Sequence, residues 1–540
     1  MTKENDAHIL GIGGLVHDAN FCLLDNQGNP IFVGEEERFC REKRRGGFPT
    51  YSISYLAKSY HIEVSETSTI VFSRETIPDD KDLKSFLKST SASVVHVNHH
   101  LSHAAGTFYS APFPEAAILT LDGLGDSICS IMAIGRGKRI EKLAALHYHH
   151  SLGILWMRTG WFLGFMADHF FSGAKVMALA AYGKPVYEDV FRGLFNLYAD
   201  GSYELNPGRF PIESVARFWE KEKPFFLEKA LGIPPREPDL PVLQVHKDIA
   251  ASMQKVSEEL TLHMVRGLHR RTGLENLCLA GGVALNCLQN ARILRDGPFE
   301  KIFITPNASD CGNGMGAALY HYHHNLGGER QWYMTTPYLG AGYSTDEIES
   351  AITKAGVEYR IPESIAKTAA MTLVQGHVIG WFQGRAEIGP RALGNRSILA
   401  DPRKPNIRNY LNQKIKHREW FRPFSAAILE GKVPEYFECK GDFPYMLFAF
   451  PARPDKADKI PGVLHVDMTS RIQTVSDKNN PLFHGLINEF YIETGIPMVL
   501  NTSFNDHGEP IVNSPTDALR RFLASGLDAL AIGPFWIERS

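Results

Sequence analysis

The sequence predicts an α/β protein, and three features lead to this class. Its 540 residues are 44% hydrophobic, which supplies apolar side chains for the cores of two or three domains. A strand–turn–strand–turn–strand pattern occurs twice in the first third of the chain. Two later segments run as strand, glycine-containing turn and helix. We therefore expect a mostly parallel sheet, whose ligands bind beyond the carboxyl ends of its strands.

The repeated strand pattern first appears as HILGIGGLVHDANFCLLDNQGNPIFVG at residues 8–34. It returns as AAILTLDGLGDSICSIMAIGRGKRIEKL at residues 116–143. The two segments match in pattern rather than in identity, which indicates a structural duplication. Two like-folded lobes that face each other would place the turn at His17 and Asp18 opposite the turn at Asp122 and Gly123, across one cleft.

A long helix is expected from QVHKDIAASMQKVSEELTLHMVRGLHRR, which stops at Gly273. Apolar residues recur in it at steps of three or four, as core-facing positions do; they are Ile249, Met253, Val256, Leu260, Met264 and Leu268. After it, NLCLAGGVALNCLQNARIL and FITPNASDCGNGMGAALYHY each predict strand, turn and helix. This alternation is the main reason to expect parallel strands.

A boundary is predicted at YLGAGYSTDEIESAI, where a new helix is capped at Ser344 or Thr345. Residues 1–345 are expected to form one unit and residues 350–540 another. The second unit contains HVIGWFQGRAEIGPRALGNRSILADPR, a strand followed by an arginine-rich loop.

Composition excludes several classes of protein. The formal net charge is -3, so no basic surface for nucleic acid is predicted. Seven scattered cysteines without a CxxC pair argue against a disulfide framework and a structural zinc site, and favour a cytoplasmic setting. No secretory leader is predicted at the N-terminus, and no apolar run reaches the ~18 residues that a membrane span needs. No membrane partner is therefore expected.

The stretch NHHLSHA offers a metal site. In a helix, His99 and His103 share one face, while His100 points about 100° away. Two imidazoles with carboxylates suit a divalent transition metal, and Asp122, at the end of a strand, is a natural third ligand. The alternative is that these are hydrogen-bonded core or surface histidines.

Three glycine-containing turns, LDGLGD, GGVALN and SDCGNGMG, follow one another along the first unit. Glycines let the backbone approach a phosphate closely, and free N–H groups at helix starts favour anions. Any one of them is also compatible with an ordinary turn, but together they favour a nucleotide cleft.

The arginine-rich loop has an alternative interpretation as a solvated positive face. Arg391 and Arg396 lie among aliphatic residues, however, and a buried guanidinium needs an anionic partner. Further candidates for an oxyanion pocket follow in the same unit: Lys414, Lys416, Arg422, Arg471, Asn501 and Ser503.

The motifs HxxxHA, LDGxGD, GGVALN, SDxGNGMG, GPRALGNRSIL and VLNTSFN, in this order, resemble the bacterial O-carbamoyltransferases of natural-product pathways. That family includes nodulation-factor, cephem and aminoglycoside carbamoyltransferases, and the resemblance covers essentially the whole chain. It implies a duplicated actin/sugar-kinase-like domain followed by a YrdC-like α/β domain. The second domain would make carbamoyladenylate from carbamoyl phosphate and ATP, and the first would pass the carbamoyl group to a hydroxyl of a small-molecule natural product, including antibiotics.

The resemblance also implies site residues. The metal ligands would be His99, His103, Asp122 and Asp310, with Fe(II) as the expected metal and Mg²⁺ accompanying ATP. His17 and Asp18 are candidates for orienting or deprotonating the acceptor hydroxyl, with a structural role as the alternative. Nucleotide binding is assigned to Gly123, Gly125, Lys175, Gly281, Gly282, Asn286, Gly312, Asn313 and Gly314. Carbamoyl phosphate is assigned to Arg391, Lys416, Arg422, Arg471, Asn501 and Ser503.

Other functions share these domain types. Threonylcarbamoylation of tRNA is disfavoured by the balance of charge, and hydrogenase maturation by the lack of CxxC motifs. A third possibility is a nucleotide-binding regulator that transfers no group, but this function would not explain the arginine-rich loop. The acceptor is expected to be selected by residues 45–65 and 155–245, where Trp156, Trp161, Phe162 and Phe165 line a pocket or belong to the core. GAKVMALAAYG departs from relatives that have glycine at Ala174 or Ala178, and a homo-oligomer is compatible with the sequence.

Overall fold

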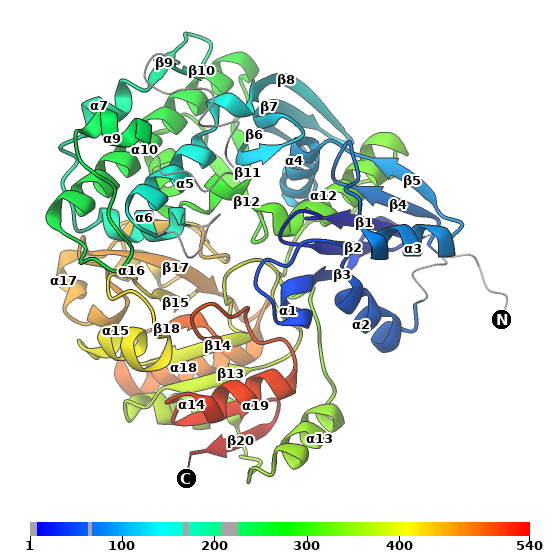
Figure 1. The fold of residues 1–540 in the computed structure, drawn as a ribbon. Coiled ribbons are helices and arrows are strands. Elements are labelled where there is room, and N and C mark those ends of the chain that lie inside the picture. Colours follow the sequence, from blue (N-terminus) through cyan, green and yellow to red (C-terminus); the bar gives the residue numbers. More distant parts are fainter. Residues whose placement is uncertain (1–7, 63–66, 166–171, 207–224, 540) are drawn as a thin grey trace.

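The computed structural model describes residues 8–62, 67–165, 172–206 and 225–539 (Figure 1). Its first sheet has the strand order β3-β2-β1-β4-β5. Strands β1, β2 and β3 form an antiparallel meander, and β4 and β5 continue parallel to β1. The strands are β1 (Ile9–Gly13), β2 (Asn20–Leu24), β3 (Pro30–Glu35), β4 (Thr69–Phe72) and β5 (Ser93–His96).

The second sheet repeats this arrangement with the order β12-β11-β6-β7-β8. Strands β6, β7 and β8 are antiparallel, and β11 and β12 run parallel to β6. The strands are β6 (Glu115–Gly125), β7 (Ile128–Arg136), β8 (Arg139–His147), β11 (Asn276–Ala280) and β12 (Lys301–Ile304). The same order and the same directions in both sheets confirm the predicted duplication and the α/β class. The expectation of a mostly parallel sheet was wrong, because the repeated three-strand segment pairs with itself in antiparallel fashion in each lobe.

Helices α4 (His99–Ser110) and α12 (Asn313–Tyr320) pack against each other where the two lobes meet (Figure 1). Glycine permits this close approach, since a Cβ on Gly316 would lie 1.9 Å from the Ser102 backbone oxygen. The contact places the turn before α12 beside the first turns of α4.

Other helices surround the two lobes. The long helix α10 buries all six residues of the predicted apolar stripe and ends at Gly273, whose φ is 64°. No helix in the described ranges is long and apolar enough to cross a bilayer. The helices around the two lobes are α1 (Glu36–Cys40), α2 (Thr50–Tyr60), α3 (Lys81–Ser89), α5 (Leu152–Phe162), α6 (Gly173–Ala180), α7 (Glu188–Arg192), α9 (Phe225–Leu231), α10 (Gln244–Thr272) and α11 (Cys287–Asp296). Strands β9 (Phe195–Leu197) and β10 (Tyr203–Leu205) form a small separate sheet.

The C-terminal part contains a mixed sheet of order β16-β17-β15-β18-β14-β13-β19-β20. Its strands are β13 (Ile379–Phe382), β14 (Arg396–Ala400), β15 (Ser425–Leu429), β16 (Ala449–Pro451), β17 (Thr469–Val475), β18 (Met498–Ser503), β19 (Ala529–Ile532) and β20 (Phe535–Glu538). The accompanying helices are α13 (Thr345–Ala355), α14 (Ile365–Val374), α15 (Ile407–Tyr410), α16 (Val433–Tyr436), α17 (Pro454–Ala457), α18 (Pro481–Thr494) and α19 (Pro515–Ala524). As predicted, Ser344 caps α13, and it forms a capping box with Glu347.

The short helix α1 joins the first lobe to the C-terminal part. Arg38 donates to the backbone oxygens of Glu387 and Gly389, while the Gly389 amide donates to the Glu35 carboxylate. On its other side Gly389 lies against Pro306, since a Cβ there would be 2.2 Å from the Pro306 oxygen. This attachment, the α1 clamp, fixes the start of the arginine loop against the turn that leads to Asp310.

Candidate active site

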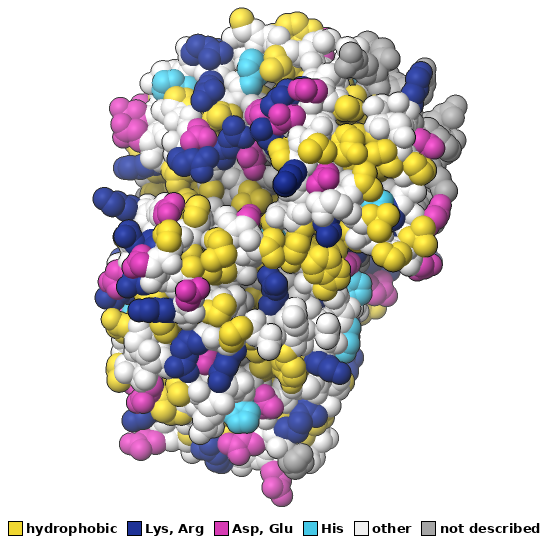
Figure 2. Space-filling model, turned by 90° about the vertical axis from the view of Figure 1, so that its left-hand side faces the viewer, with side chains coloured by type: hydrophobic (Ala, Val, Ile, Leu, Met, Phe, Trp, Pro, Cys, Tyr) yellow, Lys and Arg dark blue, Asp and Glu magenta, His cyan; other side chains and the backbone are white. Residues whose placement is uncertain are grey.

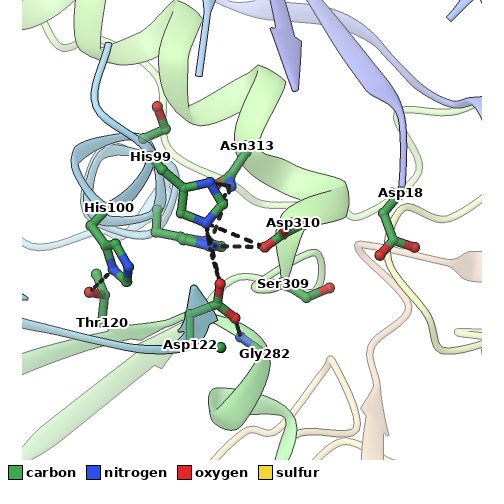
Figure 3. Close-up of polar contacts among 12 residues, drawn as sticks. Asp18, His99, His100, Thr120, Asp122, Gly282, Ser309, Asp310 and Asn313 are labelled. Carbon is green, nitrogen blue, oxygen red and sulfur yellow. Dashed lines mark hydrogen bonds and ion pairs between the residues drawn. The ribbon is translucent and has the colours of Figure 1, made fainter. Parts of the chain in front are cut away.

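Helix α4 presents the two predicted histidines. The Asn98 side chain caps the helix by accepting from the His100 and Leu101 amides at 3.0 and 3.4 Å. His99, labelled in Figure 3, and His103 are 6% and 3% exposed, and their Nε2 atoms lie 3.2 Å apart on one side of the helix. His100 points elsewhere, with its Nδ1 2.7 Å from Thr120 Oγ1, as its position in the helix predicted.

Asp122, in β6, faces both imidazoles. Its Oδ2 lies 3.2 Å from His99 Nε2, and its Oδ1 accepts from the Gly282 amide at 2.8 Å. The glycines around it serve packing: a Cβ on Gly125 would lie 2.1 Å from the His99 ring, and one on Gly153 would lie 2.6 Å from the Asp122 backbone oxygen. Gly125 is thus required for the imidazole to reach the carboxylate.

Asp310 completes the group from the turn before α12 (Figure 3). Its Oδ1 is 3.3 Å from His103 Nε2 and 3.6 Å from His99 Nε2, and the two Nε2 atoms are 3.2 Å apart. Separations of this size match the edges of a coordination shell with ligand distances of about 2.0–2.2 Å. Two imidazoles and two carboxylates also suit a divalent transition metal. The four residues His99, His103, Asp122 and Asp310 therefore fit a metal ion.

The charges of this group are strongly coupled. Burial by itself lowers the pKa of His103, but hydrogen bonds to Asp122 and Asp310 outweigh it and raise the pKa to about 9. Burial raises the pKa of Asp122, yet the two histidines hold that pKa well below its usual range. Two adjacent buried carboxylates thus require positive charge, which a divalent ion supplies.

His17 and Asp18 face the metal group from the first lobe. His17 Nδ1 is 2.9 Å from Asp18 Oδ2, and His17 Nε2 is 3.7 Å from Asp310 Oδ2. Burial lowers the pKa of His17, but Asp18 and Asp310 raise it to about 9. Asp18 has a φ of 57°, an unusual backbone conformation for a non-glycine residue, stabilised where Asn20 Nδ2 donates to its backbone oxygen at 2.7 Å.

The residues assigned to nucleotide binding divide into two sets. Those that line the main cavity are Gly123, Gly125, Lys175, Gly282 and Asn286. Those outside its lining are Gly281, Gly312, Asn313 and Gly314. Gly312 and Gly314 are instead required for packing, since a Cβ would lie 2.1 Å from the Asn307 oxygen and 2.8 Å from Asn20 Oδ1.

Two of the cavity-lining residues assigned to the nucleotide have protein partners. The Asn286 side chain caps α11 and exchanges hydrogen bonds with Gln254. Lys175 forms an ion pair with Glu419 at 2.6 Å. Among the aromatic candidates only Trp156 lines the cavity, and Trp161, Phe162 and Phe165 are buried in the core. The expected acceptor loops include residues 63–65, 166–171 and 207–224, which lie outside the described residues.

The predicted oxyanion residues gather at one end of the C-terminal sheet. Strand pairing aligns Arg471 on β17, Ser425 on β15 and Asn501 on β18 in one row. Arg471 Nε donates to Ser425 Oγ at 2.8 Å, and Lys416 Nζ donates to the Ser503 backbone oxygen at 2.7 Å. All six predicted residues line the main cavity: Arg391, Lys416, Arg422, Arg471, Asn501 and Ser503.

These cations repel one another. Burial, followed by the neighbouring Arg471, lowers the pKa of Arg391 to about 9, although nearby Cys287 opposes this shift. Burial and the neighbouring Arg418 and Arg422 hold the pKa of Lys416 well below its usual range. Because burial and mutual repulsion disfavour the positive charges of this cluster, a bound anion would stabilise them, and the cluster is suited to bind one.

Two candidate residues, Arg396 and Lys414, do not line the cavity, whereas one residue that was not predicted does. Arg396 is fully buried, but its guanidinium donates to four backbone oxygens and stacks on Phe382 instead of facing the cavity. Lys414 is exposed and lies outside the cavity lining. Arg418, which the sequence interpretation missed, lines the cavity. The only signal for it was its place between Lys416 and Arg422.

One cavity of about 730 Å³ contains both sites. Its wall includes His17, Asp122 and Asp310 from the first part of the chain and Arg391 and Arg471 from the second. A ligand can therefore contact the metal group and the cation cluster without leaving the protein.

The chain is similar in sequence to known proteins. Nodulation protein NolNO of Sinorhizobium fredii (strain NBRC 101917 / NGR234) is 35% identical, and the alignment covers 97% of this chain and 79% of that protein. Nodulation protein NolO of Bradyrhizobium diazoefficiens is 38% identical, with coverage of 82% and 79%. Full-length HypF in its phosphate- and nucleotide-bound form has a TM-score of 0.36 at 12% identity over 58% of this chain and 55% of that one, which is too weak a likeness to carry an argument.

Two family models match the chain directly. The one described as Carbamoyltransferase N-terminus covers residues 80–319, and the one described as Carbamoyltransferase C-terminus covers residues 370–539. Together they span well over half of the sequence, in the order that the motifs predicted. The chain therefore belongs to the carbamoyltransferase family and is a carbamoyltransferase enzyme.

Proposed function

We propose that this enzyme is an ATP-dependent O-carbamoyltransferase that acts on a hydroxyl of a small-molecule natural product. Residues 350–540 would convert carbamoyl phosphate, ATP and one water into carbamoyladenylate, phosphate and pyrophosphate. Residues 1–345 would then let the acceptor oxygen attack the carbamoyl carbon. The bond from that carbon to the AMP oxygen breaks, so the products are an O-carbamate and AMP, and the hydroxyl proton is released.

The single cavity shared by the two sites carries this proposal. Carbamoyladenylate is an activated mixed anhydride that water destroys. A common cavity lets it move from the cation cluster to the metal group without release into solvent. The two units would therefore act in sequence on one bound intermediate.

The cation cluster supports carbamoyl phosphate as the carbamoyl donor. Guanidinium groups bind phosphate in a bidentate manner, and Arg391 and Arg471 both line this end of the cavity. Asn501 Oδ1 is buried and has no hydrogen-bond partner among the described residues, so it is available to a donor group such as the carbamoyl amino group. The site thus offers cations for one end of the ligand and an acceptor for the other.

At the metal group, a bound Fe(II) would act as a Lewis acid that neutralises phosphate charge. His99, His103, Asp122 and Asp310 would hold it. His17 would accept the acceptor's proton at Nε2, with Asp18 fixing the ring through Nδ1. Asp18 and Asp310 raise the pKa of His17 to about 9, and a cation bound at Asp310 would lower that pKa and bring His17 closer to neutrality.

The alternative of a nucleic-acid substrate finds no support on the face shown in Figure 2. There Lys and Arg side chains are intermingled with Asp and Glu rather than gathered in a basic stripe.

The test incubates the enzyme with ATP, carbamoyl phosphate and a panel of hydroxylated metabolites. We expect carbamoyl-phosphate-dependent release of pyrophosphate, and a mass gain of one carbamoyl group on one acceptor. Release of no pyrophosphate would contradict the proposal and favour a nucleotide-binding regulator.

A further inference from the structure

The side-chain amide of Asn501 is fixed in one orientation. Its Nδ2 donates to Gln473 Oε1 at 2.9 Å and to the Ala392 backbone oxygen at 3.3 Å. The Gln473 amide is fixed in turn, because its Nε2 donates to the Leu393 backbone oxygen at 2.7 Å. A backbone oxygen only accepts, so turning either amide over would place oxygen against oxygen.

This orientation directs Asn501 Oδ1 away from the protein's own donors. The residue is 1% exposed and lines the cavity, and its Oδ1 is among the buried polar atoms without a hydrogen-bond partner in the described structure. Buried acceptors are seldom left in this state unless a ligand or water completes them. The atom therefore indicates a ligand that carries an N–H donor.

Gln473 occupies the position from which it can set this orientation. It lies two residues after Arg471 on β17, so both side chains point to the same face of the sheet. Arg471 contacts Ser425 on that face, while Gln473 contacts Asn501 in the neighbouring row. Gln473 is 3% exposed and lies outside the cavity lining, so it acts through Asn501 rather than on the ligand.

We propose that Gln473 is a positioning residue that makes the donor site select a carbamoyl group over other acyl groups. The proposal rests on carbamoyl phosphate being the donor substrate. With the amide held by Gln473, Asn501 Oδ1 accepts from the amino group of carbamoyl phosphate. Acetyl phosphate carries a methyl group at that place and leaves Oδ1 unsatisfied.

The experiment compares the full-length wild-type chain with Gln473→Met, which keeps the length of the side chain but can neither donate nor accept strongly. Pyrophosphate release gives KM for carbamoyl phosphate, and competition gives Ki for acetyl phosphate and for inorganic phosphate. For the wild type we expect Ki for acetyl phosphate to exceed KM for carbamoyl phosphate by about tenfold, the effect of one hydrogen bond. In the variant, KM should rise by about tenfold with a smaller change in kcat, and the preference should disappear.

The Ki for inorganic phosphate distinguishes a loss of selectivity for the carbamoyl group from a general disruption of the donor site. Its Ki should stay within about twofold of wild type, because the cation cluster is unchanged. A rise in this Ki that parallels the rise in KM would mean that the Arg391 loop has moved, and would overturn the proposal.

Gln289→Met is the matched control. Gln289 is also a buried glutamine, 1% exposed, but it lies on α11 outside the cavity lining. It should keep the wild-type preference. Wild-type preference in Gln473→Met would overturn the inference alone, whereas a wild-type enzyme without carbamoyl-phosphate-dependent pyrophosphate release would overturn the proposed function itself.

Discussion

Lys175 of α6 and Glu419 form an ion pair of 2.6 Å that joins the first part of the chain to the second. The lysine side chain is 6% exposed and the glutamate 22%. Arg422 lies 3.7 Å from the same carboxylate, so Glu419 connects a residue of the N-terminal part to the cation cluster.

Removal of Lys175 alone is expected to destabilise the fold, because a largely buried carboxylate loses its nearest cation. We expect Lys175→Met to lower the free energy of unfolding by about 1–3 kcal/mol and the double variant with Glu419→Gln to recover most of that loss. Denaturant unfolding measures both. The solvent-accessible pair Lys432–Glu435 provides the control, and Lys432→Met should change the free energy of unfolding much less than Lys175→Met does. Equal effects at the two pairs would contradict a structural role for the Lys175–Glu419 pair.

Loss of one metal ligand should separate the two half-reactions. We expect His103→Ala to lose bound metal and carbamoyl transfer, while pyrophosphate release stays measurable, because the cation cluster lies in the C-terminal part. Metal analysis of the purified protein and the two assays check this. His96→Ala, on the exposed strand β5, should change neither activity. Loss of pyrophosphate release together with transfer would contradict the division of labour.

Arg391→Met should stabilise the ligand-free protein, although it weakens function. Burial and neighbouring cations hold the pKa of Arg391 below its unfolded value, at about 9, so its charge opposes folding at neutral pH. For a chain of 540 residues we expect the unfolding temperature to rise by about 1 °C per kcal/mol relieved, and the stabilisation by added phosphate to disappear.

Arg385→Met is the matched control for that change. Arg385 also lies in the arginine loop but donates to the backbone oxygens of Ile31, Leu339 and Gly340. Its loss should lower the unfolding temperature. A fall in both variants would show that Arg391 stabilises the fold despite its surroundings.

His465 should make stability depend on pH. Its Nε2 donates to the Ala178 backbone oxygen at 2.8 Å, its Nδ1 is buried without a hydrogen-bond partner among the described residues, and burial lowers its pKa. His465 therefore takes up a proton near pH 6.5 in the unfolded chain but only at lower pH in the folded chain. The free energy of unfolding therefore falls as the pH decreases below about 6.5. His465→Gln keeps a donor for Ala178 and should reduce the fall in unfolding temperature between pH 7 and pH 5. An unchanged slope would contradict this assignment.

Local patterns allowed much of this architecture to be predicted. The strand repeat, the α10 stripe and the spacing of His99 and His103 depend on residues near one another in the chain. The placement of Asp310 came from the family resemblance, because it depends on contact between α12 and α4.

Other features of the site depend on contacts between distant segments. The direction of the Asn501 amide requires Gln473 and the backbone at Ala392 and Leu393, which no spacing reveals. Gly312 and Gly314 match a phosphate-binding turn in sequence, but in the structure they lack side chains because Gly312 packs against the turn at Asn307 and Gly314 against Asn20 of β2.

The α1 clamp also bears on how such enzymes can be recombined. Gly389 contacts Arg38 and Glu35 on one side and Pro306 on the other. The C-terminal part therefore joins the N-terminal part at two surfaces, one on each side of Gly389. A chimera that takes its N-terminal part from one homologue and its C-terminal part from another would need both contact surfaces of the α1 clamp from a single parent. Grafting at the predicted boundary near residue 345 without them would leave each half intact but misaligned.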